Sequence, residues 1–321
     1  MPELPEVEVI KQGLQIRLIG YKILQVEILS SKSWLISDKN LKNNVLGAKI
    51  VSIKRRAKLL IINLDTNYSL IFHLKMTGQL VLRNKISNCQ NRDSMFLDEQ
   101  EANWGGGHPT KSLVGILPDN STRIIFNLSN GLKLFFNDQR KFGWVKLVKT
   151  NDLFQFSFIK FLGPEPFNPE IKADRTSSEP DIKTSAEFLQ RIKRHQKTSI
   201  KAAILNQKII AGVGNIYADE SLWMSKIHPS QKVINLTDKQ LINLLKNIIE
   251  VMKLSIKQGG STARNYVNSE GLRGKYLDFA NVYMKEGQFC PRCLDEGREI
   301  ELIKIKVAGR GTHICPFCQK L

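Results

Sequence analysis

The first six residues of the chain, Met-Pro-Glu-Leu-Pro-Glu, combine residue types that could perform covalent chemistry. If an aminopeptidase removes Met1, which the small Pro2 permits, the new terminus is a secondary amine. An α-amino group titrates near ~8, so a useful fraction is unprotonated at neutral pH and can attack an electrophilic carbon. Glu3 and Glu6 would share one helical face near that amine. The plainer interpretation is the acidic start of a surface helix, favoured by the helix dipole.

Four of the five cysteines form two Cys-x-x-Cys pairs near the C-terminus, with 21 residues between the pairs. This spacing is typical of a two-knuckle zinc site, and residues 300–307 could form a hairpin between the knuckles. Four thiolates complete a tetrahedron, so the predicted site is structural rather than catalytic. Disulfides are the alternative, and Cys89 is interpreted as a bystander thiol. The predicted ligands are Cys290, Cys293, Cys315 and Cys318.

The charge of the chain points to a polyanionic partner. Its 321 residues carry 48 Lys and Arg against 30 Asp and Glu, which gives a net charge of +18. Nucleic acid is the first candidate for that partner and an anionic membrane surface the second. No apolar run approaches the roughly 20 residues that span a bilayer, and no signal peptide is recognisable. We therefore expect a soluble cytoplasmic protein, nucleoid-associated if bacterial, with no membrane partner.

The elements that must position these residues divide the chain into a sheet half and a helical half. In the first half no regular helical pattern separates the apolar runs, which favours an antiparallel sandwich or barrel. Ser129-Asn130-Gly131 is a hairpin signal. Residues 84–120 interrupt the pattern and are predicted to be an inserted loop that includes Trp-Gly-Gly-Gly. The predicted strands are Ile23–Ile28, Leu59–Leu64, Leu70–Leu74, Ile124–Leu128, Leu132–Phe136 and Trp144–Val148.

The second half follows a proline-containing linker and has helical patterns. Thr184 with Glu187, and Thr237 with Gln240, have the spacing of capping boxes. An apolar stripe from Leu241 to Met252 continues until a Gly-Gly pair ends it, and it is interpreted as core. The predicted division is 1–150 for a catalytic domain with an N-terminal helix, 151–183 for the linker, 184–281 for a helical DNA-binding domain and 282–321 for a zinc finger.

Three clusters in this frame suggest nucleic-acid recognition. Residues 54–58, Lys-Arg-Arg-Ala-Lys, form a basic cluster that leads into a strand and could contact phosphates. Met76 follows a strand in a predicted turn, and Arg140 with Phe142 occupies a similar setting. Apolar wedges beside an arginine fill the gap when a base leaves the stack. Without that context Met76 and Phe142 would be interpreted as core residues.

Taken together, these motifs resemble those of the formamidopyrimidine-DNA glycosylases, bifunctional base-excision enzymes that remove 8-oxoguanine and ring-opened purines. The resemblance extends over nearly the whole chain, and the order and spacing of its motifs are highly specific. The motifs are Pro-Glu-Leu-Pro-Glu-Val-Glu at 2–8, Arg-Arg-Ala-Lys at 55–58, His-Leu-x-Met-Thr-Gly at 73–78, Leu-Gly-Pro-Glu-Pro at 162–166, Gly-Val-Gly-Asn-Ile-Tyr-Ala-x-Glu at 212–220, Ile-His-Pro at 227–229, Gln-Gly-Gly-Ser-Thr at 258–262 and the terminal cysteines.

The resemblance implies an α+β protein with an N-terminal antiparallel β-sandwich, a helix-two-turn-helix module and a β-hairpin zinc finger with one structural Zn²⁺. It implies a monomer acting on damaged double-stranded DNA. By similarity Pro2 is the Schiff-base nucleophile, Glu3 its acid/base partner, Glu6 a supporting carboxylate, Lys58 a proton donor and phosphate contact, and Arg310 the residue of the δ-elimination step. The implied DNA contacts are Met76, Arg140, Phe142, Lys201, Asn215 and Tyr217.

The chain also departs from the family pattern. Asp-Pro-Arg-Arg-Phe is Asp-Gln-Arg-Lys-Phe at 138–142, and Val-Tyr-Gly-Arg is Val-Tyr-Met-Lys at 282–285. Ser121 stands where the family has a DNA-contacting histidine, and residues 265–276 are too variable to assign a base preference. Two alternatives stay open: the sister family that removes oxidised pyrimidines, and a non-enzymatic zinc-finger DNA-binding protein on the same scaffold.

Overall fold

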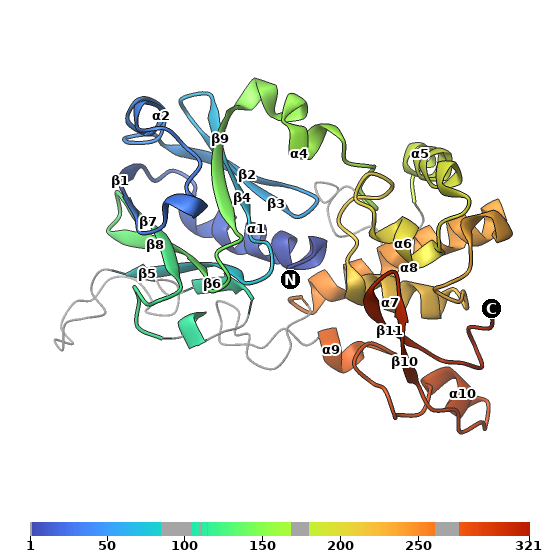
Figure 1. The fold of residues 1–321 in the computed structure, drawn as a ribbon. Helices are drawn as coiled ribbons and strands as arrows, with labels where there is room; N and C mark the ends of the chain where they lie inside the picture. The colour runs from blue at the N-terminus through green and yellow to red at the C-terminus, as the bar shows by residue number, and fades with distance from the viewer. Residues whose placement is uncertain (1, 85–103, 109–110, 114, 168–179, 261–275) are drawn as a thin grey trace. The chain divides into compact units, whose positions relative to one another are not determined.

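The computed structural model describes residues 2–84, 104–108, 111–113, 115–167, 180–260 and 276–321 (Figure 1). The chain divides into two compact units. Unit 1 contains residues 1–160 and 258–275, and unit 2 contains residues 161–257 and 276–321. Among the described ranges no helix is long and apolar enough to cross a bilayer.

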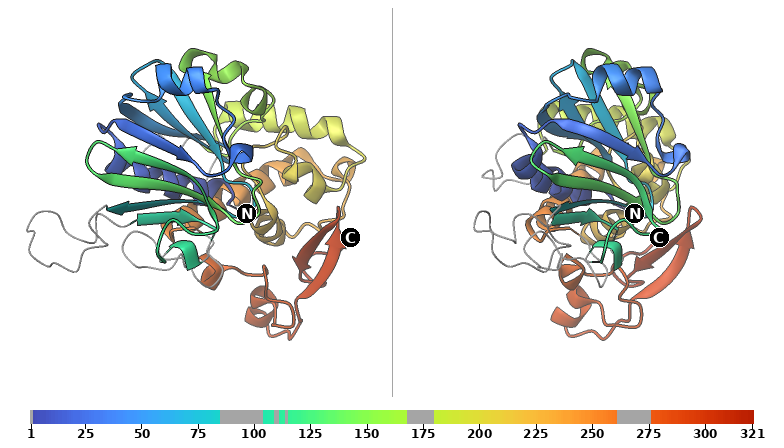
Figure 2. Two further views of the ribbon diagram at one scale, coloured as in Figure 1. Left: turned by 60° about the vertical axis from the view of Figure 1, so that its left-hand side comes forward. Right: turned by 90° about the vertical axis from the view of Figure 1, so that its left-hand side faces the viewer.

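Unit 1 is built on two antiparallel sheets that pack face to face, as Figure 2 shows. The ring of Phe72 in one sheet lies 5.8 Å from Phe126 and 6.0 Å from Phe136 in the other. The predicted antiparallel sandwich is therefore confirmed. The first sheet has the order β1 (Ile23–Ile28), β7 (Thr122–Leu128), β8 (Leu132–Asp138), β5 (Gly78–Asn84) and β6 (Trp104–Gly107); the second has β2 (Ile50–Arg56), β3 (Leu59–Leu64), β4 (Tyr68–His73) and β9 (Trp144–Lys149).

Strand β3 is buried at every position, which explains its four consecutive apolar residues, Leu59 to Ile62. Leu60 and Ile62 face the core between the two sheets. Leu59 and Ile61 face the other way, into a smaller cluster that includes Ile159 of α4 (Ser157–Lys160). A strand covered on both faces needs apolar residues at consecutive positions, because period-2 alternation serves only a half-exposed strand.

Helix α1 (Leu4–Leu18) packs one face into the same core. Val7, Ile10, Leu14 and Leu18 recur at helical spacing and are essentially inaccessible to solvent. This confirms the predicted amphipathic helix and anchors the N-terminal residues to the sandwich. Unit 1 also contains α2 (Asp38–Asn44) and the 3-10 segments η1 (Ser31–Ser33), η3 (Lys111–Leu113) and η4 (Thr150–Gln155).

All six predicted strands are present, but β2, β5 and β6 were not predicted. The prediction that Trp104-Gly-Gly-Gly belongs to an inserted loop is wrong, because these residues form β6, paired with β5. Glycine has a low strand propensity, so the sequence pattern did not indicate a strand at these residues. The lack of side chains on these glycines lets helix α1 pack closely against β6, since a Cβ at Gly106 would lie 2.7 Å from the side chain of Ile10. The remainder of the predicted loop at 85–103 lies outside the described residues.

Unit 2 combines helices with one small hairpin. The apolar stripe of α8 is buried as predicted, and the Thr237–Gln240 capping box is confirmed by reciprocal hydrogen bonds of 2.9 and 3.3 Å. The Thr184 capping box is wrong, because Asp181 caps that helix by accepting from the Thr184 N–H at 2.8 Å. The elements are α5 (Ile182–Ile192), η5 (Lys193–His195), α6 (Ile200–Leu205), α7 (Asn215–Met224), η6 (Val233–Asn235), α8 (Asp238–Lys257), α9 (Tyr276–Phe279), α10 (Pro291–Asp295), β10 (Ile303–Val307) and β11 (Arg310–Ile314).

Candidate functional site

The N-terminus of α1 brings Pro2, Glu3 and Glu6 together. Glu3 is the N-cap residue, and its main-chain N–H donates to Oε2 of Glu6 at 2.8 Å. In return the Glu3 side chain accepts from the main-chain N–H of Glu6, which completes a capping box. Pro2 and Glu3 are both buried. Two carboxyl groups are thus held beside Pro2 by the helix terminus itself, where negative charge is favourable.

Lys58 is tied to the same helix through a buried ion pair. Arg55 Nε donates to Oε2 of Glu8 in α1 at 2.8 Å, and both side chains are almost completely buried. A second guanidinium nitrogen of Arg55 donates to the carbonyl of Ala57 at 3.2 Å. Ala57 has a φ of +52° in the two-residue turn between β2 and β3, and Lys58 is its neighbour. Arg55 therefore positions the turn that carries Lys58.

The Glu8 carboxylate needs this partner to stay charged in the interior. Burial alone would raise its pKa, but the Arg55 guanidinium and the Lys11 ammonium together bring that pKa below its ordinary value. Lys11 Nζ lies 2.8 Å from Oε1 of Glu8. The basic cluster at 54–58 is thus partly structural, because Arg55 belongs to a buried ion pair, and the phosphate contact expected of the cluster stays a prediction.

His73 lies beside this turn and is neutral. It is the registered partner of Leu59, the residue after Lys58. Burial, and then the charges of Lys75 and Lys58, lower the pKa of His73 to about 3. Its Nδ1 accepts from the Lys75 main-chain N–H at 3.1 Å, which assigns the proton to Nε2. His73 therefore offers one neutral N–H donor.

The two loops predicted to carry wedge residues are joined at their bases. Residues 74–77 connect β4 to β5 and residues 139–143 connect β8 to β9, and the pairs β5–β8 and β4–β9 bring them to one end of unit 1. The Thr77 hydroxyl donates to Oδ1 of Asp138, and Gly143 N–H donates to Oδ2 at 2.6 Å. The buried Asp138 carboxylate therefore holds both loops.

The side chains beyond that buried base are exposed. Met76 is 39% and Phe142 53% exposed, and the Arg140 guanidinium lies 5.0 Å from the centre of the Phe142 ring. Lys75 and Lys141, each directly before a wedge residue, have φ angles of +52° and +59°. Left-handed backbone at non-glycine residues is strained, and such strain gathers at functional loops. The alternative that Met76 and Phe142 are core residues does not fit this exposure.

The DNA contacts predicted in unit 2 fall into two groups. Asn215 is the first residue of α7, and its Nδ2 donates to the Gly311 carbonyl of the hairpin at 3.0 Å. Arg310 is exposed at the start of β11, after a two-residue turn in which Ala308 and Gly309 both have positive φ, as a type I′ turn requires. The structure thus brings Asn215 and the Arg310 strand together.

For two residues the structure differs from the predicted direct contact. The side chain of Lys201 is completely buried and forms an ion pair with Asp219 at 2.5 Å. The side chain of Tyr217 is also completely buried, and its hydroxyl is 2.6 Å from that of Ser255. Neither side chain is accessible to a phosphate, because helix packing around α7 encloses both.

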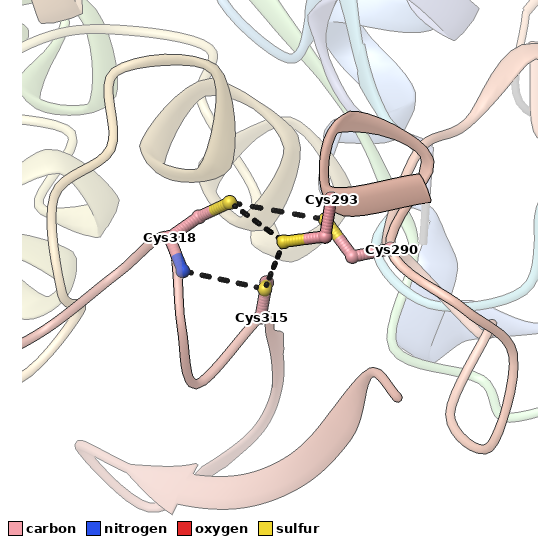
Figure 3. A group of neighbouring side chains, drawn as sticks. All are labelled: Cys290, Cys293, Cys315 and Cys318. Carbon is pink, nitrogen blue, oxygen red and sulfur yellow. Dashed lines mark hydrogen bonds between the residues drawn. The ribbon is translucent and has the colours of Figure 1, made fainter. Parts of the chain in front are cut away.

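The four cysteines predicted as ligands gather in one place, with their sulfur atoms turned toward one another (Figure 3). All four Sγ atoms lie within 4.8 Å of each other, and three of the separations are 3.4, 3.6 and 3.9 Å. A tetrahedral site with metal–sulfur bonds of about 2.3 Å requires sulfur separations of about 3.8 Å. No disulfide joins these cysteines. The cluster fits one tetrahedral thiolate-bound ion.

Trp223 of α7 and Gln319 attach this cluster to the helical part of unit 2. The Trp223 indole Nε1 donates to Sγ of Cys290 at 3.4 Å, and the Gln319 amide links the Cys315 N–H to the Ile227 carbonyl at 3.0 Å each. Burial alone would raise the pKa of Cys290, but hydrogen bonds from the Cys293 N–H and the indole bring it below the ordinary value. These donors stabilise thiolate charge around the ion site.

Another functional group not anticipated from sequence is the carboxylate of Glu220. It is fully buried in α7 and accepts from the main-chain N–H groups of Asn281, Val282 and Tyr283 at 2.8–2.9 Å. It thereby fixes the segment that leads into the cysteine hairpin. A charged pair of residues, Asp219-Glu220, inside an otherwise apolar helix was the available signal, since buried carboxylates require partners.

Comparisons with known proteins agree with this arrangement. Residues 1–145 match the model of the formamidopyrimidine-DNA glycosylase N-terminal domain, and residues 162–267 match that of its H2TH domain. The chain is 36% identical to the formamidopyrimidine-DNA glycosylase of Pelotomaculum thermopropionicum, with 100% of both chains covered, and 36% identical to that of Rickettsia conorii, with 99% of both covered.

Solved structures give the same result. The chain superposes on Lactococcus lactis Fpg in complex with abasic-site DNA with a TM-score of 0.77 at 32% identity, covering 100% of both chains. A complex of Lactococcus lactis Fpg (MutM) with N7-benzyl-Fapy-dG DNA gives a TM-score of 0.77, the same identity and the same coverage.

Proposed function

The chain belongs to the formamidopyrimidine-DNA glycosylase family, base-excision repair enzymes that act on oxidised purines, and we propose that it removes 8-oxoguanine and formamidopyrimidines from damaged double-stranded DNA and then cleaves the strand. The observation that carries the proposal is the capping box that holds Glu3 and Glu6 beside Pro2. With Met1 removed, Pro2 would present a secondary amine next to two carboxyl groups.

The reaction begins with attack of the Pro2 nitrogen on C1′ of the damaged nucleotide. The C1′–N bond to the base breaks, the base leaves with a proton, and the sugar ring opens to an iminium between Pro2 and C1′. The iminium acidifies the C2′ proton, whose removal expels the 3′ phosphate and then, in a second elimination, the 5′ phosphate. Hydrolysis of the iminium returns Pro2.

The other residues supply protons and charge. Glu3 acts as the acid/base group, Glu6 supports it, and Lys58 donates a proton and contacts a phosphate during β-elimination. Arg310 neutralises the phosphate that leaves in δ-elimination. Lys58 suits its role because the Glu8–Arg55 pair holds its turn against α1, the helix that Pro2 precedes.

Binding to DNA follows from charge and from the exposed wedge. Each phosphate contact releases counterions, so the net charge of +18 favours tight, salt-sensitive binding. Met76, Arg140 and Phe142 enter the duplex where the lesion leaves the stack, and Asn215 contacts the backbone. The substrate implies a location in the cytoplasm or at the nucleoid, where the protein would act as a monomer.

The cysteine cluster holds one structural Zn²⁺, with Cys290, Cys293, Cys315 and Cys318 as ligands. The ion supplies folding free energy to a hairpin that is too small to have its own core. Together with the helical domain at 184–281 and the linker at 151–183, residues 282–321 then form the DNA-binding half and residues 1–150 the catalytic half.

A borohydride experiment tests the mechanism. Reduction during reaction with a duplex that carries one 8-oxoguanine should trap the iminium as a covalent adduct, and peptide mapping should locate the DNA on Pro2. Protein with a retained N-terminal tag should bind DNA but give no adduct. Lys58→Ala should still be trapped on an abasic site while excising the base poorly, and Lys42→Ala in α2 should match the wild type. DNA attached to Lys58 would overturn the mechanism.

A further inference from the structure

Lys201 and Asp219 form a fully buried ion pair inside unit 2. Nζ of Lys201 in α6 lies 2.5 Å from Oδ1 of Asp219 in α7, and both side chains are 0% exposed. Taking two charges out of water is costly unless the remaining donors and acceptors are also matched. The remaining hydrogen bonds of Lys201 and Asp219 therefore indicate which part of the structure the ion pair stabilises.

Both partners use those contacts to bind the same strand, β11. Nζ of Lys201 donates to the Thr312 hydroxyl at 2.7 Å and to the Gly311 carbonyl at 3.2 Å. Oδ2 of Asp219 accepts from the His313 main-chain N–H at 3.0 Å. The three donors of the lysine thus meet one carboxylate and two groups of β11, so the pair clamps that strand onto α7 (Figure 1).

The clamp ends one residue from Arg310. The Thr312 hydroxyl that receives the Lys201 bond is itself 3.1 Å from the Arg310 carbonyl, and the Gly311 carbonyl also accepts from Asn215. The Arg310 side chain is exposed. A two-stranded hairpin is at best marginally stable alone in water, so the position of Arg310 depends on the Lys201 and Asp219 bonds that hold β11 in place.

We propose that Lys201 is a positioning residue that fixes β11, and with it Arg310, on helix α7 and that it does not itself contact DNA. Lys201 then controls the second elimination through Arg310 and leaves iminium formation at Pro2 unaffected. The role of Arg310 rests on the function proposed above, whereas the clamp on β11 can be measured without DNA.

Two variants and a control test the clamp in the full-length, zinc-loaded protein. Lys201→Met removes the lysine's bonds to β11, and Thr312→Val removes one acceptor of Lys201 together with the hydroxyl's own bond to the Arg310 carbonyl, while the buried ion pair stays intact. The control is Lys193→Met, which breaks an exposed pair with Asp238 in the same unit. Without DNA, amide hydrogen exchange over residues 310–314 should rise at least tenfold in Lys201→Met and severalfold in Thr312→Val, with zinc content unchanged. Wild-type exchange rates in both variants would overturn the clamp.

With DNA, the readout is the ratio of δ- to β-elimination products from a pre-formed abasic site. We expect this ratio to fall at least tenfold in Lys201→Met and severalfold in Thr312→Val, while borohydride trapping changes less than threefold. Arg310→Gln should give the same loss, and adding Lys201→Met to it should cause no further loss. If the losses of the two single variants multiplied in the double variant, Lys201 would act independently of Arg310. The same conclusion would follow if Lys201→Met lowered borohydride trapping as much as it lowered the product ratio.

The two proposals fail in different ways. A wild-type protein that forms no trapped adduct contradicts the Schiff-base mechanism but leaves the exchange result valid. Normal trapping together with unchanged exchange in both variants contradicts the clamp alone. If Lys201→Met does not fold, Thr312→Val decides the question, because it keeps both charges paired.

Discussion

The main-chain N–H of Arg140 donates to the hydroxyl of Thr77 at 3.0 Å, which joins the loop before β9 to the loop before β5. The same N–H lies 3.2 Å from Oδ1 of Asp138, the carboxylate that also receives the Thr77 hydroxyl. The exposed wedge residues are therefore carried by loops with a buried polar base. The residues proposed to enter DNA are thus distinct from the residues that hold the loops.

Phe142→Ala should slow excision of 8-oxoguanine from duplex DNA about tenfold, or about 1.4 kcal/mol, because the ring no longer fills the space left by the extruded base. Cleavage of a pre-formed abasic site should change much less, and single-turnover rates on the two substrates measure this. Phe154→Ala, at a phenylalanine that is 78% exposed in the same unit, is the control and should leave both rates unchanged. Equal losses on both substrates would argue against base extrusion.

Arg55→Met should destabilise unit 1 by about 3–5 kcal/mol, because it leaves the buried Glu8 carboxylate without its guanidinium partner and with only the Lys11 and Gln12 bonds to Oε1 described for it. Urea unfolding followed by tryptophan fluorescence measures the loss. Arg191→Met removes a half-exposed pair with Glu187 and should cost less than about 1 kcal/mol. If the Glu8→Leu/Arg55→Met double variant were as unstable as Arg55→Met alone, the unpaired charge would not be the cause.

His73 should make the fold sensitive to acid. Its pKa is about 3 in the folded protein against an ordinary value near 6.5, so between these values the unfolded chain binds a proton that the native one does not. Stability is unaffected by His73 above pH 6.5 and falls as the pH drops below it, by about 2 kcal/mol at pH 5. The free energy of unfolding of His73→Gln should lack this component. Parallel pH curves for the two proteins would contradict the prediction.

Cys315→Ser should reduce bound zinc toward zero and weaken DNA binding strongly, since the hairpin that carries Arg310 loses its metal while unit 1 stays folded. Elemental analysis and binding to abasic-site DNA measure the two effects. Cys89→Ser is the control, because it removes the one cysteine outside the cluster. Trp223→Phe removes the N–H···S bond to Cys290 and should speed zinc loss to a chelator without preventing binding. Full DNA affinity in a zinc-free protein would refute the metal's role.

Local sequence patterns were sufficient for six of the nine strands described in unit 1, for helix α8 and for the cysteine cluster. Strand β3 and helix α8 were predicted because apolar periodicity reports burial directly. The cysteine cluster was predicted because ligand spacing within each knuckle is a local property of the chain. The sequence also placed Glu3 and Glu6 close together, since they are three residues apart, but the capping box that they form was not predicted.

Tertiary structure alone decided which charged residues face solvent and which hold the site together. Arg55 and Lys58 are three positions apart in one basic run and are both buried, and it is Arg55 that pairs with Glu8, 47 residues earlier in the chain. Lys201 and Asp219 likewise meet across two helices and bind a strand more than 90 residues later in the chain. The sequence alone does not show which residue a charged side chain will pair with. Long-range packing selects that partner, because a charge buried without one would cost more than the fold can supply.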